Sequence, residues 1–335
     1  MTSVRQIAKH AGVSISTVSR ALNNDPGVRE ATQQKVLETA NRLGFVSAVG
    51  RRVTTNIALV YFDKETASCP FDQALQRGIL RGLDEARFDL LILDVHRDKA
   101  GDESFTQFFL RKGVRGVLVR ATQSDRHICK AIADEGFPAV VLCERFETGN
   151  ANFIGCDSRE ESARAVEYLI ALGHRRIAFG MHSVQDNDHL DRLQAYQQAM
   201  TKHGLPVDDR LVLRLNANFA GGATAMKMMR SLPDPPSAIF FADPLLALGA
   251  INAAHELQIK VPNDIAIVGF DDADLRHTCF PSITAVCQDT VRLGYEAAMG
   301  LTRLIQRDVE GPVQVTLPTY FEVNQSSGPP PEMSI

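Results

Sequence analysis

A short polar stretch near the N-terminus holds the side chains best suited to contact DNA. Its hydroxyl, amide and guanidinium groups belong to Ser14, Ser16, Thr17, Ser19, Arg20 and Asn23. Such groups can reach the phosphates and base edges of a major groove. Ile15 offers only an apolar contact, for example with a thymine methyl group, or it packs inside the protein.

These side chains must be positioned by helices, and residues 1–45 carry three helical patterns and no strand pattern. Apolar residues recur at helical spacing in the first pattern, namely Val4, Ile7, Ala8 and Ala11. Gly12 permits a turn, and Ser14 is the expected N-cap of a second helix. A third helix is predicted from about Glu30 to Leu43. This spacing is that of a helix-turn-helix, although an ordinary helical hairpin would share it.

The pattern of apolar residues changes after residue 56, where short apolar runs alternate with helical stretches. Eight runs are predicted to be strands: 57–62, 90–95, 116–121, 139–144, 176–181, 211–215, 238–243 and 265–272. Strands rich in Val, Ile and Leu with helices between them indicate parallel sheets covered on both faces. Eight strands are too many for one small sheet, so we predict two similar α/β lobes.

The charge is unevenly distributed along the 335 residues, whose formal net charge is −4. Residues 1–56 hold eight Lys and Arg against three Asp and Glu, a net charge of +5, so the remaining residues carry −9. A basic head on an acidic body suggests that the head meets a polyanion and the body does not. No apolar run is long enough to span a bilayer, and the first residues have no apolar signal core, so a cytoplasmic protein without membrane contact is expected.

Metal binding and enzyme activity each have characteristic sequence motifs. The six cysteines are scattered without zinc-finger spacing, so they are expected to be reduced thiols, with no metal site and no cofactor. The phosphate-binding loops and the serine and metal hydrolase motifs are missing, so the chain is not expected to be an enzyme.

Longer motifs resemble the lactose/galactose repressor (LacI/GalR) family. The similar stretches in the head are 8–23, 28–32 and 36–45. Those in the body include Pro70-Phe71 with 77–79, LIALGHRRIAF (169–179), ADPLLALGA (242–250), KVPNDIAIVGFDD (260–272) and PSITAV (281–286). Arg192 and Tyr196 match a further family element, although Ala195 replaces its glycine. The resemblance covers about residues 3–324. Arg20, Ile15 and Ser16 match the positions with which the family recognises its operator, so the resemblance implies that Ser16 and Arg20 read bases.

The resemblance implies a small all-α helix-turn-helix head and a body of two doubly wound parallel-sheet lobes, like a periplasmic binding protein. We place the head at 1–46, the hinge at 47–56 and the effector-binding body at 57–325. The first lobe would comprise about 57–157 and 287–314, and the second about 158–286 and 315–325. The three crossings between lobes would lie near Asp157, Val286 and Val315. Residues 326–335 are predicted to be a disordered tail.

The resemblance also implies an effector site in the cleft between the lobes. The positions that would line it are Phe71, Asp72 and Thr122 in the first lobe and Asp186, Asp188, Arg192 and Asp271 in the second. Arg192 and Asp271 together could fix paired hydroxyls of a sugar. Asp271 could instead cap the following helix, and Arg192 could form a structural salt bridge. Asp243 is expected to cap its helix.

The hinge departs most from the family, whose relatives wedge a leucine into the minor groove. Here Val53 stands at that position, and it is a shorter, β-branched wedge. Arg51 and Arg52 can bind any phosphate. We therefore expect less central kinking of the operator than relatives produce.

The most consistent function is a sequence-specific DNA-binding transcriptional regulator, expected to be a repressor controlled by a sugar-like effector. A homodimer would read a palindromic double-stranded operator. The alternative is a sugar-binding uptake protein without DNA activity, which would share the body fold.

Overall fold

The computed structural model describes residues 4–22, 25, 27–42, 54–62, 69–120, 122–144, 151–184, 186–309 and 311–331. Four of the predicted DNA contacts, Asn23, Arg51, Arg52 and Val53, lie outside these residues, and so does most of the hinge. They stay predictions. None of the described helices is long and apolar enough to cross a membrane.

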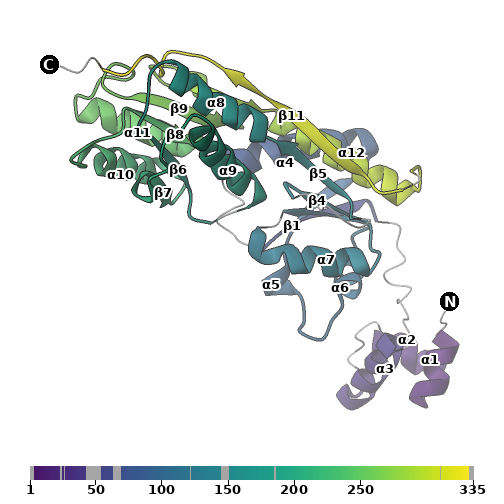
Figure 1. Cartoon of the computed structure of the whole chain (residues 1–335). Coiled ribbons are helices and arrows are strands. Elements are labelled where there is room, and N and C mark those ends of the chain that lie inside the picture. Colours follow the sequence, from purple (N-terminus) through teal and green to yellow (C-terminus); the bar gives the residue numbers. More distant parts are fainter. Residues whose placement is uncertain are drawn as a thin grey trace.

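The head is a bundle of three helices, α1 (Val4–Ala11), α2 (Ile15–Leu22) and α3 (Glu30–Arg42) (Figure 1). Its core contains Ile7, Ala11 and Val18, none of which is exposed to solvent. Gly12 ends the first helix with a φ of 66°, a left-handed conformation that costs glycine little. The helix-turn-helix prediction is confirmed.

The first lobe is built on five parallel strands in the order β2-β1-β3-β4-β5. They are β1 (Asn56–Tyr61), β2 (Asp89–Asp94), β3 (Val117–Arg120), β4 (Ala139–Leu142) and β5 (Phe153–Asp157). Two long helices, α4 (Pro70–Ala86) and α12 (Thr290–Gln306), cover one face. Three shorter ones, α5 (Val95–Asp98), α6 (Phe105–Arg111) and α7 (Arg126–Asp134), lie on the other (Figure 1).

The second lobe repeats this architecture, with its parallel strands in the order β7-β6-β8-β9-β10. They are β6 (Ile177–His182), β7 (Val212–Leu215), β8 (Ala238–Phe241), β9 (Ala266–Asp271) and β10 (Thr284–Gln288). Helices α8 (Arg159–Ala171) and α9 (Asn187–Lys202) cover one face. Helices α10 (Phe219–Arg230) and α11 (Pro244–Glu256) cover the other.

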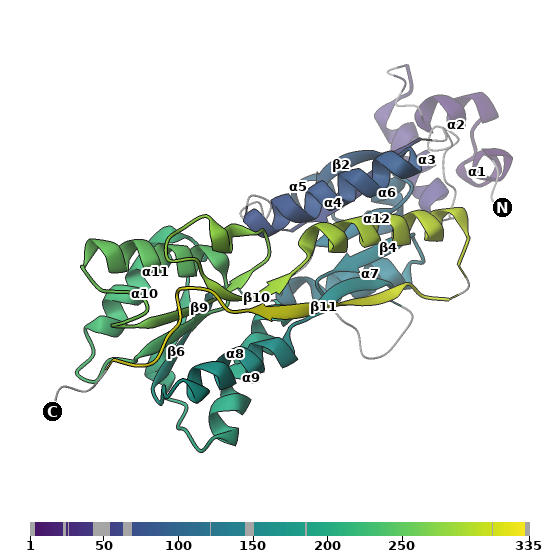
Figure 2. The same cartoon turned by 90° about the horizontal axis from the view of Figure 1, so that it is seen from above.

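One strand, β11 (Gln314–Glu322), belongs to both lobes (Figure 2). Its first half, through Pro318, pairs in parallel with β5, and its second half, from Thr319, pairs antiparallel with β10. The doubly wound two-lobe fold is therefore confirmed. The apolar-run criterion did not find this strand, because most of its side chains are exposed or half-buried.

The two long helices of the first lobe touch backbone to backbone. A Cβ atom on Gly78 of α4 would overlap the carbonyl of Val291, and one on Gly294 of α12 would overlap the carbonyl of Leu75. Glycine at these points lets the two helices approach closely on this face of the first sheet.

The chain beyond residue 325 is partly ordered, so the prediction of a disordered tail from residue 326 is wrong for its first residues. Ser326 is fully buried, and its backbone oxygen accepts a hydrogen bond from Ile267. The Gly328 carbonyl lies 2.9 Å from Nε2 of His174, whose Nδ1 contacts Ser237. The prediction from composition missed these contacts because they are made by the main chain, and the polar side chains of the tail do not indicate them.

Candidate functional site

The polar face of α2 presents the predicted DNA-contacting side chains. The backbone N–H of Thr17 donates a 3.0 Å hydrogen bond to Oγ of Ser14, which confirms Ser14 as the N-cap. The Ser14 hydroxyl also lies 2.8 Å from those of Ser16 and Thr17. Ser16, Ser19 and Arg20 are exposed. Arg20 thus extends from the same helix surface as the capping hydroxyls.

Ile15 occupies the first position of α2 and is 50% exposed. Because the core of the head is formed by other apolar side chains, Ile15 does not hold the bundle together. An exposed apolar side chain beside polar groups is suited to contact a thymine methyl. Of the two interpretations left open for Ile15, this geometry favours the contact with DNA.

A second set of buried polar side chains gathers where the two lobes face each other. We call it the interlobe cluster, and it comprises Asp72, Arg120, Asp186, Asp188, His189, Arg192, Asp243 and Asp272. Most of them follow the carboxyl ends of parallel strands, where open α/β sheets bind ligands. Among the residues that the structure describes, no three His, Cys, Asp or Glu are arranged to hold a metal ion.

Arg120, at the end of β3, links the two lobes. Its guanidinium lies 3.6 Å from Oδ1 of Asp72 in its own lobe and 3.4 Å from Oδ2 of Asp186 in the other. It also lies 5.0 Å from the ring centroid of Phe71, which is buried at the start of α4. Arg120 was not among the residues predicted for the effector site. The feature of the sequence that could have indicated it is an arginine at the end of an apolar strand.

Asp72 is fully buried and has two further partners. Tyr61 donates its hydroxyl to Oδ1 at 3.1 Å, and the Cys69 thiol lies 2.9 Å from Oδ2. Burial raises the pKa of Asp72, and Arg120 opposes this effect. The predicted position Asp72 is thus in the cluster, held by three residues of its own lobe, of which Arg120 also reaches the second lobe.

His189 was not assigned from the sequence, and the structure places it between two carboxylates. Its Nδ1 lies 2.7 Å from Asp186 and its Nε2 lies 3.0 Å from Asp243. Burial would lower the pKa of His189, but Asp186 and Asp243 outweigh burial and raise it to about 10. The ring is therefore a cation at neutral pH.

Asp243 does not cap α11, contrary to the sequence prediction. No cap hydrogen bond to its side chain is formed. Its Oδ2 accepts a hydrogen bond from the backbone N–H of His182, while its other oxygen faces His189. The charged histidine ring and the His182 amide hold the carboxylate toward the interlobe cluster instead of the helix end.

Arg192 projects from α9 and is 4% exposed. Its Nη1 donates to the Ala242 carbonyl at 2.9 Å, and its guanidinium stacks over the ring of Phe270. Asp188 lies 4.0 Å from Nη2, and its pKa is raised to about 6 by burial and by neighbouring Asp186. Nε of Arg192 has no hydrogen-bond partner among the described residues. Arg192 is therefore positioned by Ala242 and Phe270 with one donor still unused.

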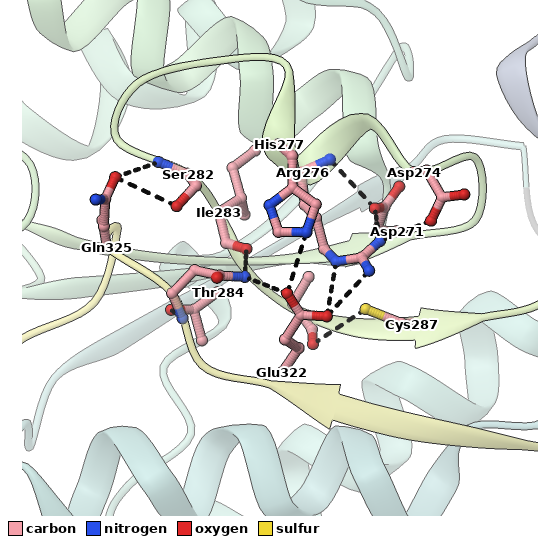
Figure 3. A network of polar contacts seen from close by, with 12 residues as sticks. Asp271, Asp274, Arg276, His277, Ser282, Ile283, Thr284, Cys287, Glu322 and Gln325 are labelled. Carbon is pink, nitrogen blue, oxygen red and sulfur yellow. Dashed lines mark hydrogen bonds and ion pairs between the residues drawn. The ribbon is translucent and has the colours of Figure 1, made fainter.

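Asp271 has a structural role in this fold. Its carboxylate accepts backbone hydrogen bonds from Ala273, Leu275 and Arg276 at the short helix η5 (Leu275–His277). Nη1 of Arg276 donates to it at 2.8 Å (Figure 3). The capping alternative is thus the one seen, and the paired-hydroxyl role proposed for Asp271 is not supported.

Arg276 connects this cap to the strand shared by the lobes. Its Nη2 lies 3.0 Å from the Glu322 carboxylate at the end of β11, and His277 lies 3.2 Å from the same group (Figure 3). The network therefore joins the loop after β9 to the crossing strand and leaves Asp271 no free oxygen.

Thr122 also has a local partner. Its hydroxyl donates to Asp125 at 2.6 Å, and its backbone N–H donates to the same carboxylate. Of the seven predicted effector positions, Thr122 and Asp271 are used within their own loops, and the other five lie at the interlobe boundary. Asp272, which directly follows Asp271, was missed and belongs to the cluster.

Two family models match the chain. The model for bacterial regulatory proteins of the lacI family matches residues 3–47, and the periplasmic binding protein-like domain matches residues 166–327. The HTH-type transcriptional regulator DegA of Bacillus subtilis (strain 168) is 30% identical and covers 98% of each chain. The chain belongs to the lacI family of bacterial regulatory proteins.

Two further relatives support the same assignment to the lacI family. The HTH-type transcriptional repressor CytR of Escherichia coli (strain K12) is 30% identical over 90% of this chain and 89% of its own. A solved complex of the transcriptional regulator CelR with cellobiose has a TM-score of 0.70 and 28% identity, covering 97% of this chain and all of CelR. The lacI-family protein is a DNA-binding transcriptional regulator, and the uptake alternative is not favoured.

Proposed function

We propose that this regulator is a repressor whose effector binds between the lobes, among the residues of the interlobe cluster. The observation that carries the proposal is the contact of Arg120 with both Asp72 and Asp186, because it makes the two lobes share one buried polar site. CytR is a repressor by name and CelR was solved with cellobiose, which supports repression and a carbohydrate effector here. Phe71, Asp188 and Arg192 complete the proposed effector site.

The control of DNA binding by the effector follows from the burial of this site. Arg120 and Asp186 are each more than 90% buried, so an effector can enter only when the lobes separate. The effector therefore stabilises whichever lobe arrangement fits it. If only one arrangement holds two heads at the spacing of the operator, effector binding and DNA binding are thermodynamically coupled.

The DNA partner is a palindromic operator read by a homodimer. A two-fold axis lets two α2 helices enter successive major grooves about one helical turn apart. Ser14, Ile15, Ser16, Thr17, Ser19, Arg20 and Asn23 are the proposed contacts in the groove and on the backbone. Arg51, Arg52 and Val53 are the proposed contacts at the operator centre. Because its target is the chromosome, the regulator acts in the cytoplasm.

The decisive experiment starts from DNA selected by the full-length protein out of a random library. A gel shift with a selected palindrome, repeated with a panel of sugars, should show binding that one sugar changes. Arg192→Ala should abolish that response and leave DNA affinity nearly intact, because Arg192 lies in the body. Lys202→Ala, at an exposed position of the same helix, is the matched control. Selection of no common sequence would contradict the proposed DNA activity.

A further inference from the structure

The chain that follows the shared strand β11 is built into the second lobe through Ser326. This residue is fully buried, and its carbonyl accepts a 2.8 Å hydrogen bond from the backbone N–H of Ile267 in β9. Its hydroxyl donates to the carbonyl of Ile267 and accepts a 2.9 Å hydrogen bond from the backbone N–H of Thr284 in β10. Ser326 therefore joins β9 to β10 with three hydrogen bonds.

These bonds lie where the pairing of β9 with β10 begins. The first pair in the register of the two strands is Thr284 with Val268. Ile267 is one residue earlier in β9, and its N–H donates to Ser326. Buried main-chain groups need hydrogen-bond partners, and here the tail supplies them. Ser326 thus completes this end of the second sheet.

The residues on either side of Ser326 are held by the same lobe. The side chain of Gln325 accepts a hydrogen bond from the backbone N–H of Ser282 (Figure 3). The carbonyl of Ser282 accepts from the backbone N–H groups of both Gln325 and Ser326. The hydroxyl of Ser327 lies 2.6 Å from that of Thr284. Three consecutive residues of the tail are therefore bound to β10 or to the loop before it.

His174 holds the next residue of the tail. It follows α8 and is fully buried. Its Nε2 lies 2.9 Å from the carbonyl of Gly328, and its Nδ1 lies 2.8 Å from the hydroxyl of Ser237. Because a carbonyl can only accept, Nε2 carries the proton and donates to the tail. Tyr168 in α8 adds a hydroxyl 3.2 Å from that of Ser327.

The strand that leads into this segment has its two halves in different lobes. Residues of β11 through Pro318 pair with β5 of the first lobe, and residues from Thr319 pair with β10 of the second (Figure 2). The strand ends at Glu322, three residues before Gln325. Since each half is tied to one lobe, a change in the angle between the lobes must bend the strand where its pairing partner changes.

We propose that residues 325–328 form a C-terminal clamp, which fixes the second half of β11 to the second lobe and confines bending to the step between Pro318 and Thr319. Ser326 and His174 are its positioning residues. All the hydrogen bonds described for the clamp are to residues of the second lobe, so it restrains only that half of the strand. The inference goes beyond the proposed effector control, because the clamp acts in the same way with any effector or with none.

Hydrogen–deuterium exchange of the full-length protein tests the clamp, because a bonded amide exchanges only when the structure around it opens. Ser326→Ala leaves the buried N–H of Thr284 without its acceptor. We expect exchange in residues 319–323 to become about 10- to 100-fold faster, while residues 314–317 keep the wild-type rate. Ser231→Ala removes an exposed serine hydroxyl from the same lobe and should change neither segment.

His174→Ala is the second variant, since it removes the donor to Gly328 and leaves Ser326 in place. It should produce the same difference between the two halves of β11, with a smaller increase in the second half. His255→Ala, at an exposed position of α11, is the matched control. If Ser326→Ala does not fold, His174→Ala supplies the comparison by itself.

The comparison between the two halves of one strand decides the outcome. Faster exchange confined to residues 319–323 supports the clamp. Equal increases in residues 314–317 and 319–323 would show that the tail stabilises the whole body without fixing one end of β11, and would overturn the inference. Wild-type exchange in both variants would also overturn it, because pairing with β10 would then be enough to hold the strand.

Discussion

The guanidinium of Arg120 in the first lobe lies 3.4 Å from the carboxylate of Asp186 in the second. Both side chains are more than 90% buried, and Asp186 also forms the N-cap of α9. One contact therefore connects the end of a strand in one sheet to the start of a helix in the other lobe.

Arg120→Met should lower the free energy of unfolding by about 3 kcal/mol, because it leaves Asp72 and Asp186 buried without their shared cation. Urea unfolding at pH 7 measures the change. Arg210→Met breaks an exposed ion pair with Asp208 and is the control, for which no measurable change is expected. Equal effects of the two substitutions would show that Arg120 has no special role between the lobes.

Asp272→Asn should stabilise the ligand-free protein at pH 8 by roughly 2–4 kcal/mol. Burial and the negative charges of Asp271, Asp243 and Asp72 raise the pKa of Asp272 to about 7, although the nearby Arg192 opposes them. Because the folded protein then keeps the proton to a higher pH than the unfolded chain, the wild type loses stability as pH rises from about 4 to 7.

The advantage of the Asp272→Asn variant should therefore be largest at pH 8 and smallest at pH 4. Denaturation midpoints across this range measure it, with Asp209→Asn as a control that should track the wild type. A constant difference at every pH would refute the raised pKa.

Arg20→Ala should weaken binding to the selected operator by about 1–3 kcal/mol, because a bidentate contact with a base edge would be lost. The side chain is exposed, so the melting temperature should not change. Lys130→Ala removes an exposed cation from α7 in the body and should leave affinity unchanged. A loss that is the same for unrelated DNA would assign Arg20 to phosphate contact instead of base reading.

Phe280→Asp should shift the proposed homodimer to monomer, since Phe280 is 84% exposed in the loop after η5 and a self-associating surface would cover it. Analytical ultracentrifugation at micromolar concentration measures the shift. Val184→Asp places the same charge at another exposed apolar residue, 48% exposed, and should remain dimeric. Dissociation by both variants, or by neither, would place the interface elsewhere.

The sequence by itself determined the head and the class of the body. The helix-turn-helix depends on core residues such as Ala8 and Val18 and on the left-handed turn at Gly12, which are close in the chain, so helical spacing and turn chemistry are enough to predict it. Parallel buried strands leave apolar runs that can be read without the fold. The doubly wound lobes follow from those runs and the helices between them.

Only the tertiary structure decided which polar side chains meet. Asp271 and Asp272 are adjacent and chemically identical, yet the first turns back to cap η5 and the second is buried with an Oδ1 that has no hydrogen-bond partner among the described residues. Arg120 and Asp186 are 66 residues apart, and nothing local to either indicates the contact. The direction of a side chain and the pairing of distant charges depend on how two sheets are placed. The periodicity of a sequence does not indicate how the two sheets are placed relative to each other.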